Sequence, residues 1–106
     1  MYATVRQYRF GAGSVHDLMR RVDTEFADRL RALPGFVAYQ VIDCGEHRLA
    51  SVTTFRDEDS AWRSNELAAE FVKARLAEFR VERTDAQGGE VMVGRAEQDV
   101  LVVTHH

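Results

Sequence analysis

Residues 34–55 read PGFVAYQVIDCGEHRLASVTTF. Two runs in this stretch, 36–43 and 48–55, are rich in β-branched and aromatic residues, which is typical of β-strands. The residues between them, 44–47, include a glycine and predict a tight turn, and a Gly-x pair at its centre favours a two-residue type II′ turn. The stretch therefore predicts an antiparallel β-hairpin that starts directly after a helix-stopping Pro-Gly pair.

The centre of the turn decides which residues of the hairpin face one another. With the Gly-x pair at the centre, we expect Val41 opposite Ala50 and Tyr39 opposite Val52. The first strand of the hairpin is apolar on both sides, which are formed by Phe36, Ala38 and Ile42 on one and by Val37, Tyr39 and Val41 on the other. Both faces of the sheet therefore need a cover.

Helical periodicity is present on both sides of the hairpin. Upstream, apolar residues recur at spacings of three and four from Val15 to Leu33, and Ser14 is suited to cap this helix. Downstream, the polar residues 56–60 can cap a second helix that runs to about Phe79. We expect the buried stripe of the second helix to consist of Ala61, Asn65, Ala68, Val72, Leu76 and Phe79, with Leu67 and Phe71 beside it.

The ends of the chain supply the remaining strands. Residues 2–10 predict a first strand, 80–89 a polar loop, and 90–94 a fourth strand. A short apolar run at 99–104 predicts a fifth strand or an arm. The resulting order, β-α-β-β-α-β, predicts an α+β fold of the ferredoxin-like kind, with two helices on one face of an antiparallel sheet.

Bulk properties narrow the class of protein. The 106 residues suit one domain, which we place at 1–94, with a C-terminal extension at 95–106. The net charge of −3, with basic and acidic residues interspersed, argues against a nucleic-acid partner. Cys44 is the only cysteine, so no intramolecular disulfide can form. Because neither a signal peptide nor an apolar run of about 20 residues occurs, we expect a cytoplasmic protein without a membrane partner.

Two helices can cover only one face of the predicted sheet. Large exposed apolar faces are rare on monomers, and a second copy of the same sheet would cover this one economically. The alternative is a monomer whose C-terminal extension folds across the open face. We expect the homodimer.

Three segments carry a family resemblance: Pro34-Gly35-Phe36 before the hairpin, VTTFRDED at 52–59, and AWRSNELA at 61–68. With them the chain resembles the antibiotic biosynthesis monooxygenase superfamily of dimeric α/β-barrel proteins over residues 1–94. The resemblance implies a cofactor-independent monooxygenase acting on a small aromatic or quinol-type substrate. Two alternatives stay open, namely a non-catalytic dimeric module that binds a small molecule or is only structural, and a lyase or isomerase on the same scaffold.

The resemblance also implies site residues. Trp62 would be a pocket tryptophan and Asn65, one helical turn further, a catalytic neighbour. Tyr39 and Phe71 would contact the substrate. Each has a structural alternative: Trp62 can simply pack at a helix–sheet junction, Asn65 can bond to backbone or to the dimer mate, and Tyr39 can be a core residue.

Metal and haem are not expected. No group of His, Cys, Asp and Glu shows ligand spacing, and Gly11-Ala12-Gly13 is a turn rather than a phosphate loop. Haem-degrading relatives carry a haem-ligand histidine on the second helix, at a position that falls near Val72 here, and this helix has none. His16 and His47, at a helix start and in a turn, are expected to be solvated. The sequence therefore predicts no cofactor.

Overall fold

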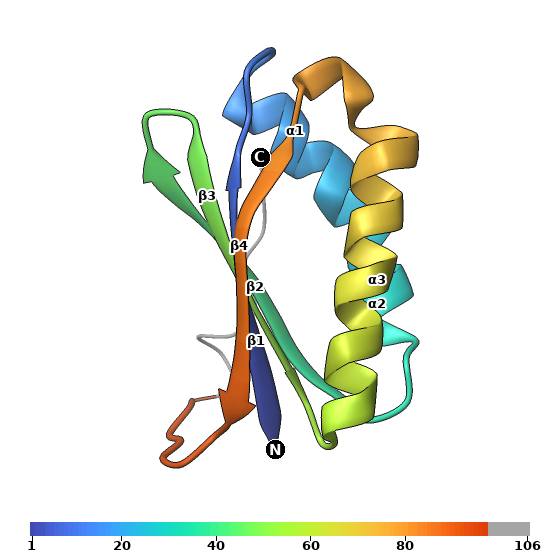
Figure 1. Ribbon diagram of the computed structural model, residues 1–106, viewed down its shortest axis with the longest axis vertical. Helices are drawn as coiled ribbons and strands as arrows, with labels where there is room; N and C mark the ends of the chain where they lie inside the picture. Colours follow the sequence, from blue (N-terminus) through green and yellow to red (C-terminus); the bar gives the residue numbers. More distant parts are fainter. Residues whose placement is uncertain (98–106) are drawn as a thin grey trace.

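The computed structural model describes residues 1–97 of the chain, and the expected features at 99–104 and His105-His106 lie outside this part. Its sheet is antiparallel with the strand order β2-β3-β1-β4. The strands are β1 (Tyr2–Arg9), β2 (Phe36–Gly45), β3 (Arg48–Phe55) and β4 (Glu82–Glu90). All helices lie on one face of the sheet (Figure 1). This arrangement confirms the expected α+β ferredoxin-like fold.

The first of the two helical segments on the sheet is continuous, and its pitch changes locally. It consists of α1 (Val15–Arg21), the π-helical turn η1 (Val22–Phe26) and α2 (Ala27–Arg31). Ser14 caps it as expected, because its hydroxyl accepts a hydrogen bond from the Asp17 amide at 3.1 Å. The π-turn was not predicted, since the three-four spacing of the apolar residues continues through it. Such turns often occur beside functional sites.

The second helical segment begins and ends close to the expected residues. Asp57 caps α3 (Glu58–Arg75), and its carboxylate accepts from the Ser60 amide at 3.3 Å. The chain then passes through the short 3₁₀ helix η2 (Ala77–Phe79) instead of continuing as α-helix. Among the described residues, no helix is long and apolar enough to cross a membrane.

The hairpin forms, but its turn and register differ from the expected ones. Its two loop residues are Glu46 and His47, with φ of 55° and 62°. Positive φ at both positions defines a type I′ turn, not type II′. The turn thus lies one residue further along than expected, and Val41 pairs with Ser51 while Tyr39 pairs with Thr53.

The expected fourth strand is wrong. The structure has β4 at Glu82–Glu90, in what we predicted to be a loop, and Val91–Val93 lies beyond it. This strand is at the edge of the sheet and exposed along its whole length, so its pairing with β1 fixes its position and no apolar pattern is required. The expectation that both faces of the sheet are apolar therefore rests on β2 and not on the last strand.

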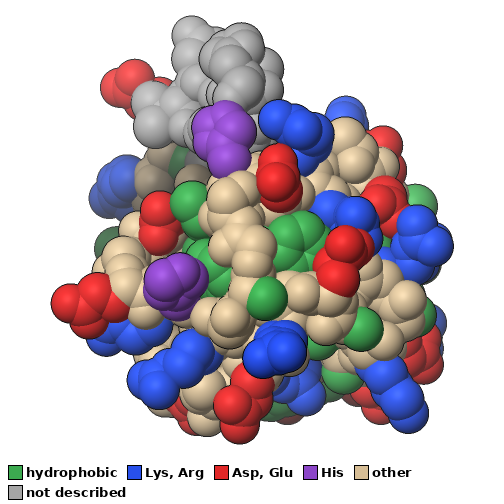
Figure 2. Space-filling model, turned by 90° about the horizontal axis from the view of Figure 1, so that it is seen from above, with side chains coloured by type: hydrophobic (Ala, Val, Ile, Leu, Met, Phe, Trp, Pro, Cys, Tyr) green, Lys and Arg blue, Asp and Glu red, His purple; other side chains and the backbone are tan. Residues whose placement is uncertain are grey.

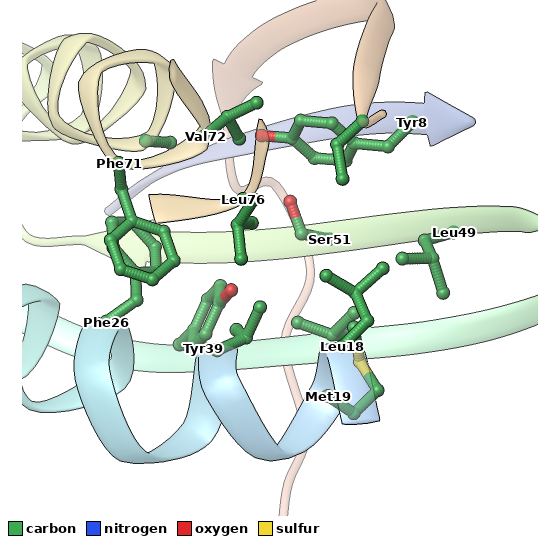
Figure 3. Close-up of a pocket in the computed structure, with 14 residues that line it drawn as sticks. Tyr8, Leu18, Met19, Phe26, Tyr39, Leu49, Ser51, Phe71, Val72 and Leu76 are labelled. Carbon is green, nitrogen blue, oxygen red and sulfur yellow. The ribbon is translucent and has the colours of Figure 1, made fainter. Parts of the chain in front are cut away.

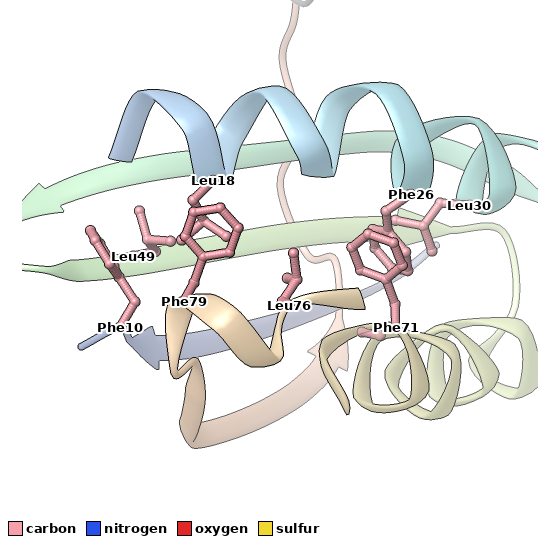
Figure 4. Packing of buried hydrophobic residues seen from close by; sticks show 9 residues of the cluster. Phe10, Leu18, Phe26, Leu30, Leu49, Phe71, Leu76 and Phe79 are labelled. Carbon is pink, nitrogen blue, oxygen red and sulfur yellow. The ribbon is translucent and has the colours of Figure 1, made fainter. Parts of the chain in front are cut away.

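The hydrophobic core fills the space between the helices and the sheet (Figure 4). Phe26 stacks on Phe71 with ring centroids 4.9 Å apart, which joins η1 to α3. The buried stripe expected for the second helix is largely confirmed, because Ala61, Asn65 and Ala68 on α3 are buried, as are Leu76 and Phe79 just beyond it. Val72 is half-buried.

The other face of the sheet carries apolar side chains without a helix over them. Val5 and Val52 are paired there on β1 and β3, and Ile42 is paired with Ala50. Val5 and Ile42 are 40% and 49% exposed. At the end of the molecule seen in Figure 2, by contrast, basic and acidic side chains are interspersed around a small apolar area.

Candidate functional site

A cavity lies between the sheet and the two helical segments that cover it (Figure 3). The centres of water molecules can occupy about 40 Å³ of it. Its wall is apolar except for the hydroxyl groups of Tyr8, Tyr39 and Ser51. The flexible side chain of Met19 is one of those that line the cavity.

The fold explains how the three hydroxyl groups reach one cavity. Tyr8, Tyr39 and Ser51 lie on β1, β2 and β3, which are neighbours in the sheet. Alternation along each strand turns them toward the helices. In Figure 3 the three hydroxyl oxygens point into the space between the strands and the helices. The polar atoms of the cavity therefore all come from the sheet, while the helices supply apolar walls.

Tyr39 and Phe71, the two expected substrate contacts, both line this cavity. Tyr39 packs edge-on against Phe26 at 5.9 Å, and Phe71 stacks on the same ring. Phe26 is the last residue of the π-turn η1, so this turn contributes the ring that both aromatic neighbours contact.

The Tyr39 hydroxyl is neutral in the folded protein. Burial raises its pKa well above the ordinary value, and the positive charge of Arg6 only partly opposes this effect. Tyr8 and Asp23 raise the pKa further. Among residues 1–97 no group forms a hydrogen bond with this hydroxyl, so its proton is available to an acceptor in the cavity.

Trp62 lies outside the cavity lining. Its side chain is 39% exposed, packs against Tyr2 with ring centroids 6.0 Å apart, and donates from Nε1 to Glu58 at 3.4 Å. Gly88 allows this packing, because a Cβ there would come within 3.0 Å of the Trp62 ring. The structure thus places Trp62 at a junction of α3 with the edge of the sheet.

Asn65 is buried, one turn of α3 from Trp62, but it is not part of the cavity wall either. Its backbone carbonyl accepts from Arg83 Nη1 at 3.1 Å, whereas its side-chain Oδ1 has no donor in the described part of the chain. A buried acceptor without a partner is rare in folded proteins. Asn65 therefore has a hydrogen-bonding capacity that these residues leave unused.

Arg6 is the residue that sequence reasoning missed. It is 1% exposed, and its guanidinium donates to Ser51 Oγ at 3.0 Å, to the Ser64 carbonyl at 3.1 Å and to Thr53 Oγ1 at 2.7 Å. One signal was present in the sequence. Arg6 is in phase with Tyr2, Thr4, Tyr8 and Phe10, so strand alternation alone turns it toward the helices.

Together these side chains form a buried polar layer under α3, made of Thr4, Arg6, Ser51, Thr53, Ser64 and Asn65. The Thr4 hydroxyl, like Asn65 Oδ1, has no partner among residues 1–97. Ser51 belongs to both the polar layer and the cavity wall. The layer therefore meets the cavity at this residue.

The fit of a metal or haem can be tested on the side chains themselves. In the described part of the chain, no three His, Cys, Asp or Glu side chains gather as a metal site. The haem degrader MhuD from Mycobacterium tuberculosis, whose structure holds two haems, has a similar fold (22% identity, 91% of this chain, 100% of that chain, TM-score 0.62). Here α3 has no histidine, and neither His16 nor His47 lines the cavity. These residues do not fit an axially ligated haem.

Comparisons with known proteins identify the fold. No family model and no curated protein matches the sequence. A dimeric ferredoxin-like protein from an uncultured marine organism is 17% identical over 92% of this chain and 100% of that chain, with a TM-score of 0.66. SnoaB, a cofactor-independent oxygenase from Streptomyces nogalater, is 15% identical over 91% and 98%, with a TM-score of 0.61.

A third solved structure carries the family description. This Chloroflexus aurantiacus protein, described as an antibiotic biosynthesis monooxygenase, is 14% identical over 90% of this chain and 96% of that chain, with a TM-score of 0.64. The chain thus shares the fold of antibiotic biosynthesis monooxygenase-type proteins, as the sequence resemblance implied. At these identities the likeness concerns the fold alone.

Proposed function

We propose that this protein is a cofactor-independent monooxygenase-like protein that acts on a small aromatic or quinol-type molecule in the cytoplasm. One observation carries the proposal: a cavity walled by aromatic and aliphatic side chains has hydroxyl groups as its polar atoms and a buried guanidinium behind them. Such a site suits a flat apolar ring with one or two oxygen substituents. The fold shared with SnoaB supports the same class.

The chemistry would follow from the substrate. Loss of a phenolic proton makes the ring electron-rich enough to pass an electron to O₂. One oxygen atom then ends in the substrate as a ring hydroxyl group and the other leaves as water. Oxidation of the quinol to the quinone supplies two of the four electrons, and the ring C–H bond that is replaced supplies the other two. The protein would exclude water, orient the ring and stabilise the anion.

Each expected site residue would have a distinct role in this proposal. Tyr39 and Phe71 would hold the substrate ring, since both already line the cavity. Asn65 would offer its unused Oδ1 or its amide group to a substrate oxygen once the cavity opens toward the polar layer. Trp62, one turn before Asn65 on α3, would be reached by a substrate that extends along the helix beyond the cavity.

Oxygen consumption with 1,4-naphthohydroquinone, corrected for autoxidation without protein, tests this proposal. Trp62→Phe and Asn65→Ala should each slow oxygen uptake while the protein stays folded. Arg63→Ala is the matched control, because this exposed residue lies beside Trp62 on α3. Unchanged turnover in both variants removes Trp62 and Asn65 from the site, and no turnover above the control reaction in the wild type rejects the oxygenase.

A second candidate is a non-catalytic dimeric module that binds a small molecule or is only structural. The small free volume of the cavity and the position of Trp62 outside its wall favour this candidate. It predicts no oxygen consumption, with saturable ligand binding in the binder form and none in the structural form. Calorimetric titration with the oxidised compound, 1,4-naphthoquinone, separates these two forms.

The proposed assembly is a homodimer in which the two open sheet faces pack together. The paired Val5 and Val52, together with Ile42, supply an apolar surface for this contact. The description of one structural neighbour as dimeric supports it. A dimer of this kind leaves the helices and the cavity on the outside of the sheet pair.

A further inference from the structure

The buried guanidinium of Arg6 has no counter-ion. Among residues 1–97 no carboxylate pairs with it, and its three partners are two hydroxyl groups and one backbone carbonyl. Arginine does not lose its proton in proteins, so the charge persists. Removing an unpaired ion from water is costly even after relaxation. A buried positive charge that only neutral groups contact attracts a nearby anion more strongly than an exposed charge does.

The guanidinium also has N–H groups that form no hydrogen bond with residues 1–97. It has five N–H groups, and the three hydrogen bonds use one each from Nε, Nη1 and Nη2. The groups that accept hydrogen bonds from Arg6 on β3 and α3 are Ser51, Thr53 and Ser64, none of which titrates. The titratable Tyr39 on β2 lies in its electric field and is uncharged, and Arg83 on β4 adds a positive charge at the carbonyl of Asn65. Its positive charge is therefore not neutralised from within the polar layer.

The charge acts on the cavity through two neighbours. Ser51 accepts from Arg6 Nε and also lines the cavity, so its hydroxyl proton is free to point at a ligand. Tyr39 lies within the electric field of Arg6, and its hydroxyl is a neutral donor at the cavity. Figure 3 shows the hydroxyls of Tyr8, Tyr39 and Ser51 directed into the same space. Three donors thus meet beside one buried positive charge.

We propose that this end of the cavity binds the ionised oxygen of an aromatic ligand, a phenolate or enolate, with the Ser51 and Tyr39 hydroxyls as donors and Arg6 as the charge that stabilises it. The inference rests on the proposed function in assuming that the cavity takes an aromatic molecule. Arg6 is a positioning residue here, because it acts through Ser51. It follows that the preferred substrates carry an acidic hydroxyl group.

A purely structural role of Arg6 makes a different prediction. In that case the guanidinium ties β1 and β3 to α3, and its loss should destabilise the fold. If Arg6 is held for an anion, replacing it by the apolar, similarly sized methionine should leave the melting temperature unchanged or raise it, because a buried unpaired charge is removed. Arg6→Lys, which keeps the charge without the fork of donors, is the matched control.

The test uses 4-nitrophenol, whose phenolate absorbs visible light, with its methyl ether 4-nitroanisole as the neutral analogue. Bound to the wild-type protein, 4-nitrophenol should have a pKa about 1 to 3 units below its value in water, the effect of a nearby opposite charge. Each unit corresponds to a tenfold preference for phenolate over phenol. Arg6→Met should abolish the shift and Arg6→Lys should keep part of it, while 4-nitroanisole should bind equally well at all pH values.

Three results would overturn the anion site: equal pKa values of the probe on wild type and Arg6→Met, no binding of the phenolate at millimolar concentration, or tighter binding of the ether. The measurement needs no turnover, so it separates this inference from the oxygenase proposal. An Arg6-dependent phenolate preference without oxygen consumption keeps the anion site and rejects the oxygenase. Quinol oxidation at the same rate in Arg6→Met keeps the oxygenase and rejects the anion site.

Discussion

The Nε atom of Arg6 donates a hydrogen bond of 3.0 Å to the hydroxyl of Ser51, directly across from it on the neighbouring strand. This contact joins a buried positive charge to the wall of the cavity, since Ser51 belongs to both. We expect Ser51→Ala to lower the free energy of unfolding by about 1 to 3 kcal/mol, because a buried charged donor loses its acceptor.

The second arm of a double-mutant cycle serves as control for this substitution. In an Arg6→Met background the donor is absent, so Ser51→Ala should cost little there. Urea unfolding of the four proteins measures the coupling. Equal costs of Ser51→Ala in both backgrounds would show that the hydrogen bond contributes nothing to stability.

Met19 lines the cavity from α1 and limits the space available to a ring. We expect Met19→Ala to tighten the binding of 4-nitrophenol while lowering the free energy of unfolding by about 1 to 2 kcal/mol, less than for a fully buried methionine. Calorimetric titration and urea unfolding measure the two effects. Met92→Ala, an exposed methionine beyond β4, should change neither. Weaker binding by Met19→Ala would mean that the ligand uses this side chain as a contact.

Gly88 and Gly89 on β4 form a matched pair. A Cβ at Gly88 would lie 2.9 Å from Tyr2 Cε1 and 3.0 Å from Trp62 Cζ2, whereas one at Gly89 meets open space. We expect Gly88→Ala to cost about 1 to 2 kcal/mol of stability through overpacking and to shift the fluorescence of Trp62, the only tryptophan. Gly89→Ala should do neither. Identical spectra for the two variants would refute the packing of Trp62 against β4.

A substitution at Val5 tests whether the protein forms the proposed homodimer. It is 40% exposed and paired with Val52 on the open face, so Val5→Lys would bury a charge if a second sheet covers it. Light scattering after gel filtration should give a dimer mass for the wild type and a monomer mass for Val5→Lys. Glu66→Lys introduces the same side chain on the exposed side of α3 and should stay dimeric. A monomeric wild type would contradict the proposed assembly.

Because the pKa of Tyr39 is raised in the folded state, we expect the protein to lose stability at alkaline pH. Above about pH 10 the unfolded tyrosine loses its proton, but the raised pKa keeps Tyr39 protonated in the folded state. The unfolded chain then binds fewer protons, so the free energy of unfolding falls by about 1.4 kcal/mol per pH unit until the raised pKa is reached. Tyr39→Phe should lack this slope in urea unfolding between about pH 9.5 and 11. Equal slopes in both proteins would mean that Tyr39 ionises freely.

Features that depend on neighbouring residues in the sequence were predicted well. The Ser14 cap, the hairpin and the start of α3 each follow from a few consecutive residues. The hairpin turn was misplaced by one residue, because Gly45, for all its positive φ, lies before the two loop residues. Non-glycine residues at both positive-φ positions gave no signal in the sequence.

Features that depend on tertiary pairing were not predicted. The polar β4 is a strand only because β1 offers it a row of backbone partners. Tyr39 lies on the predicted first strand of the hairpin and Phe71 beside the predicted apolar stripe of the second helix, and both line the cavity. Arg6 was passed over, since a charge on a strand is ordinarily taken as solvent-facing, although its place in the alternation indicated otherwise.

Two hydrogen bonds from the sheet to α3 end on the backbone of the helix. Arg6 donates to the carbonyl of Ser64 and Arg83 to that of Asn65, the next residue. Every amino acid supplies such a carbonyl, so these hydrogen bonds do not depend on the chemical type of the side chain at either position. Selection can therefore vary the inward residues of the helix, and with them the ligand, while the helix keeps its register on the sheet. Backbone groups of α3 thus contact the sheet, while its inward side chains determine which ligand binds. This division allows homologues of a small protein to diverge in ligand specificity without a change of fold.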